Sequence, residues 1–322
     1  MEATSATKLA ATAAAVAAAA LAGFAVGKTR GWRDSQSFRR RPPIVHPSHG
    51  ADPSFYAHGG KLIIVTGGAS GVGAAVVSAF VRHGAYVAFA DRDAKSAAKL
   101  LDQHEAERER LLFVEADLAD AAAATRVVTA ARAWRQGAAV DVLVNNVGVQ
   151  QNNMPVHLLR EADWDKVHAV NLKSYFLFSK ACLPPMLERR AGVILNMASV
   201  QGQQSQVGIP AYASSKGAIL SLTRQMAMDY SSSGVRVLSI SPGTILTDLV
   251  RQNIAEEGAS VEGIGAQYPL GRVGEPEDLG ELCVFLASER ARNLTGSNVH
   301  CDGGIMAMGS WGTRVGLASM GL

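Results

Sequence analysis

Residues 61–73 of this 322-residue chain are Lys-Leu-Ile-Ile-Val-Thr-Gly-Gly-Ala-Ser-Gly-Val-Gly. The first six form an apolar, β-branched run typical of a buried strand, and an amphipathic segment at Ala74–His83 follows the glycines. A glycine-rich turn between a strand and a helix permits a tight bend and brings pyrophosphate close to the helix N-terminus. The stretch therefore predicts a dinucleotide-binding turn. A nucleotide triphosphatase loop is excluded because Ala74, and no Lys-Ser/Thr pair, follows Gly73.

Strand and helix signals alternate outward from this turn. The expected strands are Lys61–Thr66, Tyr86–Ala90, Leu111–Glu115, Val140–Asn145, Val193–Met197, Val235–Ile240 and Asn298–Cys301. The expected helices are Ala74–His83, Ala94–Arg110, Ala121–Arg135, Ala162–Leu187, Tyr212–Tyr230 and Pro276–Ser288. Unbroken apolar strands that alternate with helices indicate a parallel sheet covered on both faces. We therefore expect an α/β fold: a single domain with a Rossmann-like, doubly wound parallel sheet in three αβα layers.

Two further features carry chemistry. Asp91 ends the second strand, where a carboxylate can accept hydrogen bonds from an adenosine ribose diol and repel a 2′-phosphate; a strand-ending turn or a helix cap shared with Asp93 is the alternative.

Tyr212 and Lys216 lie four residues apart at the start of an expected helix, so their side chains share one face. An ammonium beside a phenol lowers the phenol pKa from about 10 toward neutrality. Taken alone, this spacing also fits two solvated side chains.

These motifs occur in one order and spacing with Asn145-Asn146-Val147-Gly148, Asn171, Ser199, Pro242-Gly243, Gly271–Asp278 and Asp302-Gly303-Gly304. Together, from about Gly60 to Met306, they resemble the short-chain dehydrogenase/reductase family in its single-domain branch. Val147, where the family usually has alanine, and His300-Cys301 before the last motif are departures.

The resemblance implies a catalytic tetrad of Asn171, Ser199, Tyr212 and Lys216. Tyr212 would exchange a proton with the substrate oxygen, and Ser199 would hydrogen-bond the same oxygen. Lys216 would lower the tyrosine pKa and bind the nicotinamide ribose, and Asn171 would hold a water that connects Lys216 to solvent. Each residue alone also fits a structural role, as an interior amide, a strand-end cap or a surface cation.

The resemblance also implies a set of cofactor contacts. Asp117 and Leu118 would contact adenine, with a plain helix cap as the alternative for Asp117, and Asn145 and Gly148 would line the adenosine side. Asp91 favours NAD(H), whereas Arg92 leaves NADP(H) as the less favoured cofactor. The full expected set is Thr66, Gly67, Ser70, Gly71, Val72, Gly73, Asp91, Arg92, Asp117, Leu118, Asn145, Gly148, Tyr212, Lys216, Pro242, Gly243 and Thr247.

The expected function is that of an NAD(H)-dependent oxidoreductase that interconverts a secondary alcohol and a carbonyl by hydride transfer. The alternative is a nucleotide-binding scaffold or regulator that has lost catalysis. Amide side chains after two strands favour a small polar substrate such as a sugar or polyol, with a lipid or steroid alcohol as second choice. They are Gln150, Gln151, Asn152, Asn153, Gln201, Gln203, Gln204 and Gln206. Residues Thr244–Pro269 are expected to form a lid that could add an apolar wall.

Composition limits the other classes of function. Outside residues 1–41 the chain carries 24 basic and 26 acidic residues, so no basic surplus indicates a nucleic acid partner. Cys182, Cys283 and Cys301 are widely spaced, which favours reduced thiols over a disulfide framework or a metal site.

Residues 1–58 differ in composition from the rest and are expected to be a targeting or anchoring segment plus a linker at Ser48–His58. The alanine-rich run Leu9–Gly27, with basic flanks, fits a marginal membrane anchor facing the cytoplasm or an organelle transit peptide for chloroplast or mitochondrion; otherwise the protein would be cytoplasmic. The catalytic domain would span residues 59–306, and a tail would span residues 307–322.

The resemblance to the family also implies a homodimer or homotetramer. Its subunits would pair through Ala162–Leu187 and Tyr212–Tyr230.

Overall fold

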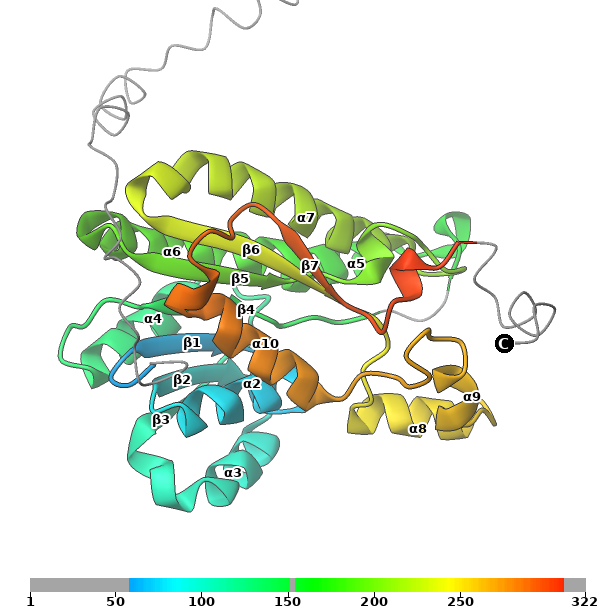
Figure 1. Cartoon of the computed structure of the whole chain (residues 1–322), viewed down its shortest axis with the longest axis horizontal. Coiled ribbons are helices and arrows are strands. Elements are labelled where there is room, and N and C mark those ends of the chain that lie inside the picture. The colour runs from blue at the N-terminus through cyan, green and yellow to red at the C-terminus, as the bar shows by residue number, and fades with distance from the viewer. Residues whose placement is uncertain (1–57, 151–153, 310–322) are drawn as a thin grey trace, which may run out of the picture. The chain divides into compact units, whose positions relative to one another are not determined.

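The computed structural model describes residues 58–150 and 154–309. Its centre is a parallel sheet with the strand order β3-β2-β1-β4-β5-β6-β7 (Figure 1). The strands are β1 (Leu62–Thr66), β2 (Tyr86–Asp91), β3 (Leu111–Glu115), β4 (Val142–Asn145), β5 (Gly192–Met197), β6 (Val235–Pro242) and β7 (Asn298–Cys301). The order reverses between β1 and β4, which is where open α/β sheets bind ligands at the carboxyl ends of the strands. The predicted fold class is confirmed.

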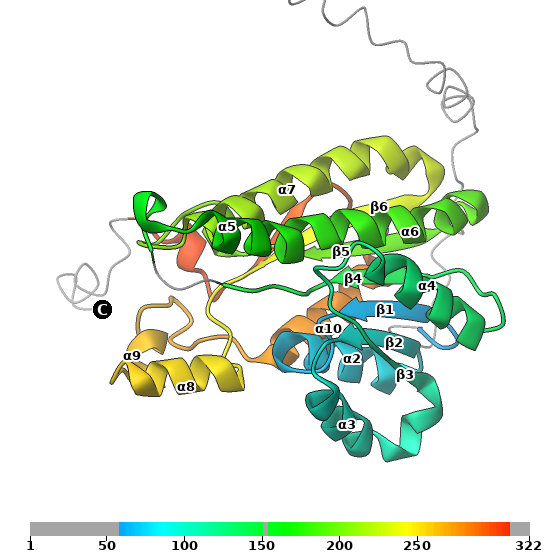
Figure 2. The same ribbon diagram turned by 180° about the vertical axis from the view of Figure 1, so that it is seen from behind.

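Helices cover both faces of the sheet (Figures 1 and 2). Ile63 and Val65 of β1 pack in a core with α2 (Gly71–Arg82), α3 (Ala94–Gln103) and α10 (Pro276–Ala287). Leu62 and Ile64 point the other way, into a second core with α4 (Ala123–Trp134), α6 (Ser174–Arg189) and α7 (Pro210–Tyr230). Successive residues of a strand face opposite sides of a sheet, so burial on both sides explains the unbroken apolar strands.

Two helices that the sequence predicted as continuous are interrupted. The segment expected at Ala94–Arg110 leaves helical geometry at His104, whose side chain lies 2.7 Å from the Ser78 hydroxyl on α2, and continues as the 3₁₀ turn η3 (Glu105–Arg110). The segment expected at Ala162–Leu187 is α5 (Glu161–His168), the π turn η5 (Ala169–Lys173) and α6. Periodicity did not reveal the π turn because an inserted residue leaves the apolar pattern on either side intact.

The segment predicted to be a lid is largely helical. It contains α8 (Asp248–Glu256) and α9 (Val261–Gly265), which lie beyond the carboxyl ends of the strands in both views (Figures 1 and 2). A small core of Leu246, Ile254 and Val273 holds them together. Short 3₁₀ turns complete the chain: η4 (Val156–Leu158), η6 (Val200–Gly202), η7 (Ser231–Ser233), η8 (Glu289–Ala291) and η9 (Ile305–Ala307).

The linker prediction is wrong at its last residue. His58 is fully buried, with Nε2 2.9 Å from the Val284 carbonyl and its ring edge-on to Phe80. Its imidazole contacts both α2 and α10, so His58 belongs to the packed domain. The remaining predictions for residues 1–57, including the run Leu9–Gly27, and those for 310–322 lie outside the described residues. Among the helices that are described, none is both long and apolar enough to cross a membrane.

Candidate active site

The glycine-rich turn closes tightly between β1 and α2. Gly67 has a left-handed φ of 64°, and a Cβ on Gly73 would lie 1.9 Å from the Gly67 carbonyl oxygen. Only glycine fits where backbone approaches backbone this closely. Ser70 stands at the N-cap of α2, is exposed and makes no side-chain cap hydrogen bond, while Val72 is half-buried. The N-terminus of α2 thus lacks a side-chain cap, which leaves its backbone N–H groups available to an anionic pyrophosphate.

Asn146 was not among the predicted site residues, yet it fastens this turn. Its Nδ2 donates to the carbonyls of Thr66 and Gly67, each at 3.0 Å. Asn145, predicted to line the adenosine side, is instead fully buried and donates to Asn196 and Ser179. Strand alternation explains the correction, because adjacent residues at the end of β4 face opposite sides of the sheet.

The Thr66 side chain also makes structural hydrogen bonds. Its side chain is fully buried, and its Oγ1 accepts from the backbone nitrogens of Asn146 at 2.9 Å and Val147 at 3.2 Å. The Thr66 hydroxyl therefore joins β1 to the loop after β4, and the expected cofactor contact of Thr66 stays a prediction.

Asp91 lies beside the glycine-rich turn, as predicted. Its Oδ2 accepts from the Ala69 nitrogen and its Oδ1 from the Asp93 nitrogen, both at 3.1 Å. Asp93 separately caps α3 by accepting from Lys95 and Ser96. Backbone donors thus fix the Asp91 carboxylate at the end of β2, and Arg92 beside it is exposed.

The adenine-side residues divide between surface and core. Asp117 is exposed and accepts from the Ala119 nitrogen at 3.0 Å, which is the local turn that the sequence left open as an alternative. The Leu118 side chain is buried with Ala116 and Ala123, so only its backbone is left to contact a ligand.

Three of the expected contact residues lie at or just beyond the carboxyl end of β6, and one of them reaches the turn. Thr247 caps α8 by accepting from the Val250 nitrogen, and its Cγ2 would lie 3.0 Å from a Cβ on Gly71. Pro242 ends β6, and the Gly243 nitrogen donates to the Cys301 carbonyl at 3.2 Å. The start of the predicted lid therefore contacts the glycine-rich turn.

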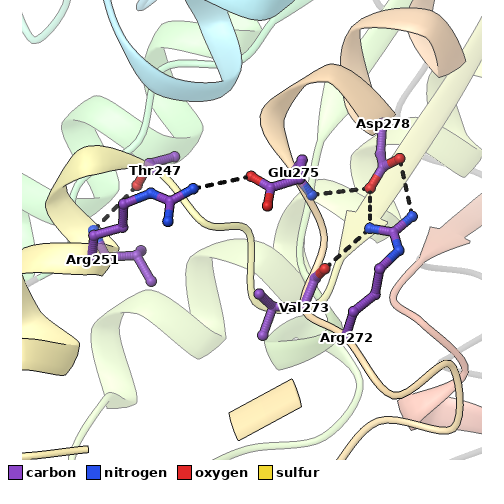
Figure 3. Close-up of polar contacts among 7 residues, drawn as sticks. Thr247, Arg251, Arg272, Val273, Glu275 and Asp278 are labelled. Carbon is purple, nitrogen blue, oxygen red and sulfur yellow. Dashed lines mark hydrogen bonds and ion pairs between the residues drawn. The ribbon is translucent and has the colours of Figure 1, made fainter. Parts of the chain in front are cut away.

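The base of the lid is tied to α10 by charged side chains (Figure 3). Arg251 of α8 lies 3.5 Å from a Glu275 carboxylate oxygen, and the Glu275 nitrogen donates to Asp278 at 3.0 Å. Arg272 reaches both oxygens of Asp278, at 2.7 and 3.3 Å. These contacts give the Gly271–Asp278 motif a structural role. They hold the predicted lid against the N-terminus of α10.

Ser199, Tyr212 and Lys216 come together at the ends of β5 and α7. Tyr212 is hydrogen-bonded to Ser199, whose Oγ also accepts from the Gln201 nitrogen at 3.1 Å. Lys216 is buried, and its Nζ donates to the Met197 carbonyl at 2.7 Å and lies 5.5 Å from the centre of the Tyr212 ring. The predicted proximity of these three residues is therefore what the structure shows.

In the chain by itself, the pKa of Tyr212 shifts in the direction opposite to the lowering expected from Lys216. Burial raises the pKa of Tyr212 above its ordinary value of 10.0, and the hydrogen bond with Ser199 only partly opposes this. Burial also lowers the pKa of Lys216 to about 7, so much of the lysine is neutral near physiological pH. A lysine that is partly neutral and bonded to a carbonyl favours the phenolate less than a full cation would.

Asn171 sits in the π turn, fully buried. Its Oδ1 accepts from the Val149 nitrogen at 2.8 Å, and its Nδ2 donates to the Val149 carbonyl at 2.9 Å and to Ser215 at 3.2 Å. Gly148 lies next to it, since a Cβ there would be 3.6 Å from Lys216 Nζ and 3.8 Å from Asn171 Oδ1. The Asn171 side chain thus holds the loop after β4 beside Lys216.

The amides expected to line a polar pocket are partly bonded to one another. Gln201 exchanges hydrogen bonds with Gln206, while Gln203 contacts His300 and Asn298. Gln204 contacts Met306, and Gln150 is exposed. Residues 151–153 lie outside the described residues.

The residues present fit a nicotinamide dinucleotide. The glycine-rich turn leaves no room for a Cβ at Gly73, Asp91 is a carboxylate held beside that turn and able to accept from a ribose diol, and Lys216 offers a buried ammonium. Cys182 and Cys283 are buried, Cys301 is half-buried, and all three are free. Within residues 58–150 and 154–309, no group of three or more His, Cys, Asp or Glu side chains could hold a metal ion.

Fold and site together define an oxidoreductase that uses a nicotinamide dinucleotide. A family model described as "Enoyl-(Acyl carrier protein) reductase" matches residues 67–306. The chain belongs to the short-chain dehydrogenase/reductase family, whose members bind nicotinamide cofactors, and it is an enzyme that acts on CH–OH groups.

Individual relatives agree with this family. 2-(S)-Hydroxypropyl-CoM dehydrogenase 3 of Xanthobacter autotrophicus is 41% identical, covering 77% of this chain and 97% of the relative. Inactive 2-(S)-hydroxypropyl-CoM dehydrogenase 2 of the same organism is 42% identical, covering 71% and 99%. A crystal structure titled as a putative gluconate dehydrogenase from Agrobacterium tumefaciens has a TM-score of 0.73 and 28% identity, covering 79% and 98%.

Proposed function

We propose that this enzyme uses NAD(H) to interconvert a small polar secondary alcohol and its carbonyl, with Tyr212 as the general acid/base. The observation that carries this proposal is the cluster of Tyr212, Ser199 and Lys216 at the carboxyl end of β5. A bound nicotinamide would accept or supply the hydride.

Side chains of the protein transfer the proton of the substrate hydroxyl. Tyr212 exchanges it with the substrate oxygen, and Ser199 donates to that oxygen as charge develops. Lys216, when protonated, favours the Tyr212 phenolate and offers its remaining N–H groups to the nicotinamide ribose. Because the Asn171 side chain is bonded to Val149 and Ser215, we assign the predicted water to the backbone of the π turn.

Asp91 supports NAD(H) over NADP(H). Its carboxylate is held by two backbone N–H groups beside the glycine-rich turn, where it would accept from a ribose diol and repel a phosphate. Arg92 is exposed and is the residue that would favour NADP(H).

The substrate proposal rests on relatives and on loop polarity. Two of the similar proteins are named 2-(S)-hydroxypropyl-CoM dehydrogenase 3 and putative gluconate dehydrogenase, and both names indicate a substrate with a hydroxyl group. The amide-rich loop after Ser199 agrees with this class, although its amides also bond to one another. A lipid or steroid alcohol remains the second choice.

The catalytically silent scaffold is the competing function, and a relative named as inactive shows why it needs a test. Purified protein with NAD(H) should turn over members of a panel of polyols, hydroxy acids and their carbonyl forms, measured by nicotinamide absorbance. Steroid alcohols form the comparison set, and a hundredfold preference for them would end the polar-substrate proposal. Cofactor binding without turnover of any compound would favour the scaffold.

We also propose a homo-oligomer. Fewer residues are exposed for pairing than the two whole segments named in the sequence analysis. Within the segment Ala162–Leu187, which is expected at the interface, the apolar residues Val167, Val170, Tyr175 and Phe178 are buried within this chain. Phe176 on α6 is 50% exposed and Met228 on α7 is 81% exposed, so these two are available for pairing. Light scattering at micromolar concentration tests this, and a monomeric mass would contradict it.

A further inference from the structure

Tyr175 is a buried tyrosine next to the proposed proton-transfer residues. It is the second residue of α6, its side chain is fully buried, and its ring packs with Ala198 and Ile219. A buried hydroxyl needs a hydrogen-bond partner, so its position is informative.

The Tyr175 hydroxyl lies between two backbone carbonyls. It is 3.0 Å from the Val147 oxygen, in the loop after β4, and 3.1 Å from the Met197 oxygen, at the end of β5. A phenol has one proton, so the two carbonyls share one donor. The loop that it holds backs the glycine-rich turn, since a Cβ on Gly67 would lie 2.9 Å from the Val147 Cα.

The Met197 oxygen has a second donor, the Lys216 Nζ at 2.7 Å. Two titratable side chains lie close to this ammonium: Tyr212 on α7 and Tyr175 on α6, with ring centres 5.5 and 5.8 Å away. When two donors share one carbonyl oxygen, each is bound less strongly than it would be alone. The Tyr175 hydroxyl therefore weakens the hold of Met197 on Lys216.

We propose that Tyr175 is a positioning residue: by sharing the Met197 carbonyl, its hydroxyl weakens the bond that holds the Lys216 ammonium and so limits the support that Lys216 gives to Tyr212. The inference rests on the proposed function, in which Lys216 supports the Tyr212 phenolate. The Tyr175→Phe substitution keeps the buried ring and removes only the shared donor. Met197 then binds the Lys216 ammonium more strongly, so Lys216 stays charged to higher pH and favours the Tyr212 phenolate more.

The first experiment needs no turnover. In protein with ¹³C-labelled lysine, the resonance absent from Lys216→Met identifies Lys216, and its titration is compared between wild type and Tyr175→Phe. Stronger bonding of the ammonium to Met197 should raise the Lys216 pKa by about half a pH unit or more. Tyr230→Phe, at the far end of α7, is the matched control and should leave it unchanged. An unchanged or lowered pKa in Tyr175→Phe would overturn the proposal.

The second experiment reads the effect on the reaction. Tyr175→Phe should move the acidic limb of kcat for alcohol oxidation to lower pH, with a gain of about threefold at pH 7 that disappears at alkaline pH. An equal loss at every pH would indicate loss of packing alone and would also overturn it. A wild type that oxidises no alcohol, while the lysine titration shifts as expected, would refute the proposed function and leave the shared carbonyl established.

Discussion

The side-chain amide of Asn171 pairs with the backbone of Val149 through two hydrogen bonds, of 2.8 and 2.9 Å. An amide matched in this way to both groups of one residue fixes the loop after β4 against the π turn. Because the same amide donates to Ser215 on α7, the residue before Lys216, it links three elements of the site.

Replacing Asn171 by Ala should leave both backbone groups of Val149 without these partners. We expect the free energy of unfolding to fall by about 1–3 kcal/mol, measured by urea denaturation. Lys173→Ala, in the same π turn, is the control and should change it little, because its side chain is not part of this pairing. Equal stability of the two variants would show that the pairing is not stabilising.

Replacing Tyr212 by Phe should abolish the proton transfer while leaving the cofactor contacts in place. The turnover rate should fall by about 10²–10⁴-fold, since general acid/base groups contribute this much. The dissociation constant of NAD(H), measured by fluorescence, should stay near the wild-type value. Turnover retained in this variant would refute the role of Tyr212.

Lys216 makes the stability depend on pH. Burial lowers its pKa from the ordinary 10.5 to about 7 in the folded chain, so between these values the unfolded chain binds the extra proton and stability rises with pH. From pH 7 to 8.5, below the titration of the buried tyrosines, the gain should be about 1–2 kcal/mol. Lys216→Met should lack this gain, and a parallel pH dependence of the two proteins would contradict the burial effect.

Asp91→Asn should shift cofactor preference toward NADP(H). Loss of the negative charge removes the repulsion of a 2′-phosphate, so the ratio of the NADP(H) to the NAD(H) dissociation constant should fall by about tenfold or more. Asp93→Asn is the control, because that carboxylate caps α3. Tighter binding of NADP(H) than of NAD(H) by the wild type would refute the assignment.

Asp278→Ala should loosen the N-terminus of α10. The variant loses the helix-capping hydrogen bond from the Glu275 nitrogen and also the ion pair with Arg272. The ion pair is exposed to solvent, so the capping bond should contribute most of the lost stability. We expect a loss of about 1–2 kcal/mol in thermal or urea unfolding. Glu277→Ala in the same turn is the comparison, and if it costs as much, the cap is not responsible.

The sequence by itself determined the fold class, and it predicted that Ser199, Tyr212 and Lys216 would meet, as they do in the structure. Unbroken apolar strands require burial on both faces, and the glycines of 67–73 permit one kind of turn, so local physics was sufficient there. The spacing of Tyr212 and Lys216 likewise placed both on one helical face, because one turn separates them.

Only the tertiary structure decided what each polar atom bonds to. Asn145 and Asn146 are neighbours in sequence, but the sheet buries the first and turns the second toward Gly67. The pKa of Lys216 depends on how deeply α7 buries it, and the sharing of the Met197 carbonyl with Tyr175 depends on α6 meeting β5. Periodicity sets which face a residue lies on, whereas its partners come from elements that are distant in sequence and meet only when the chain folds.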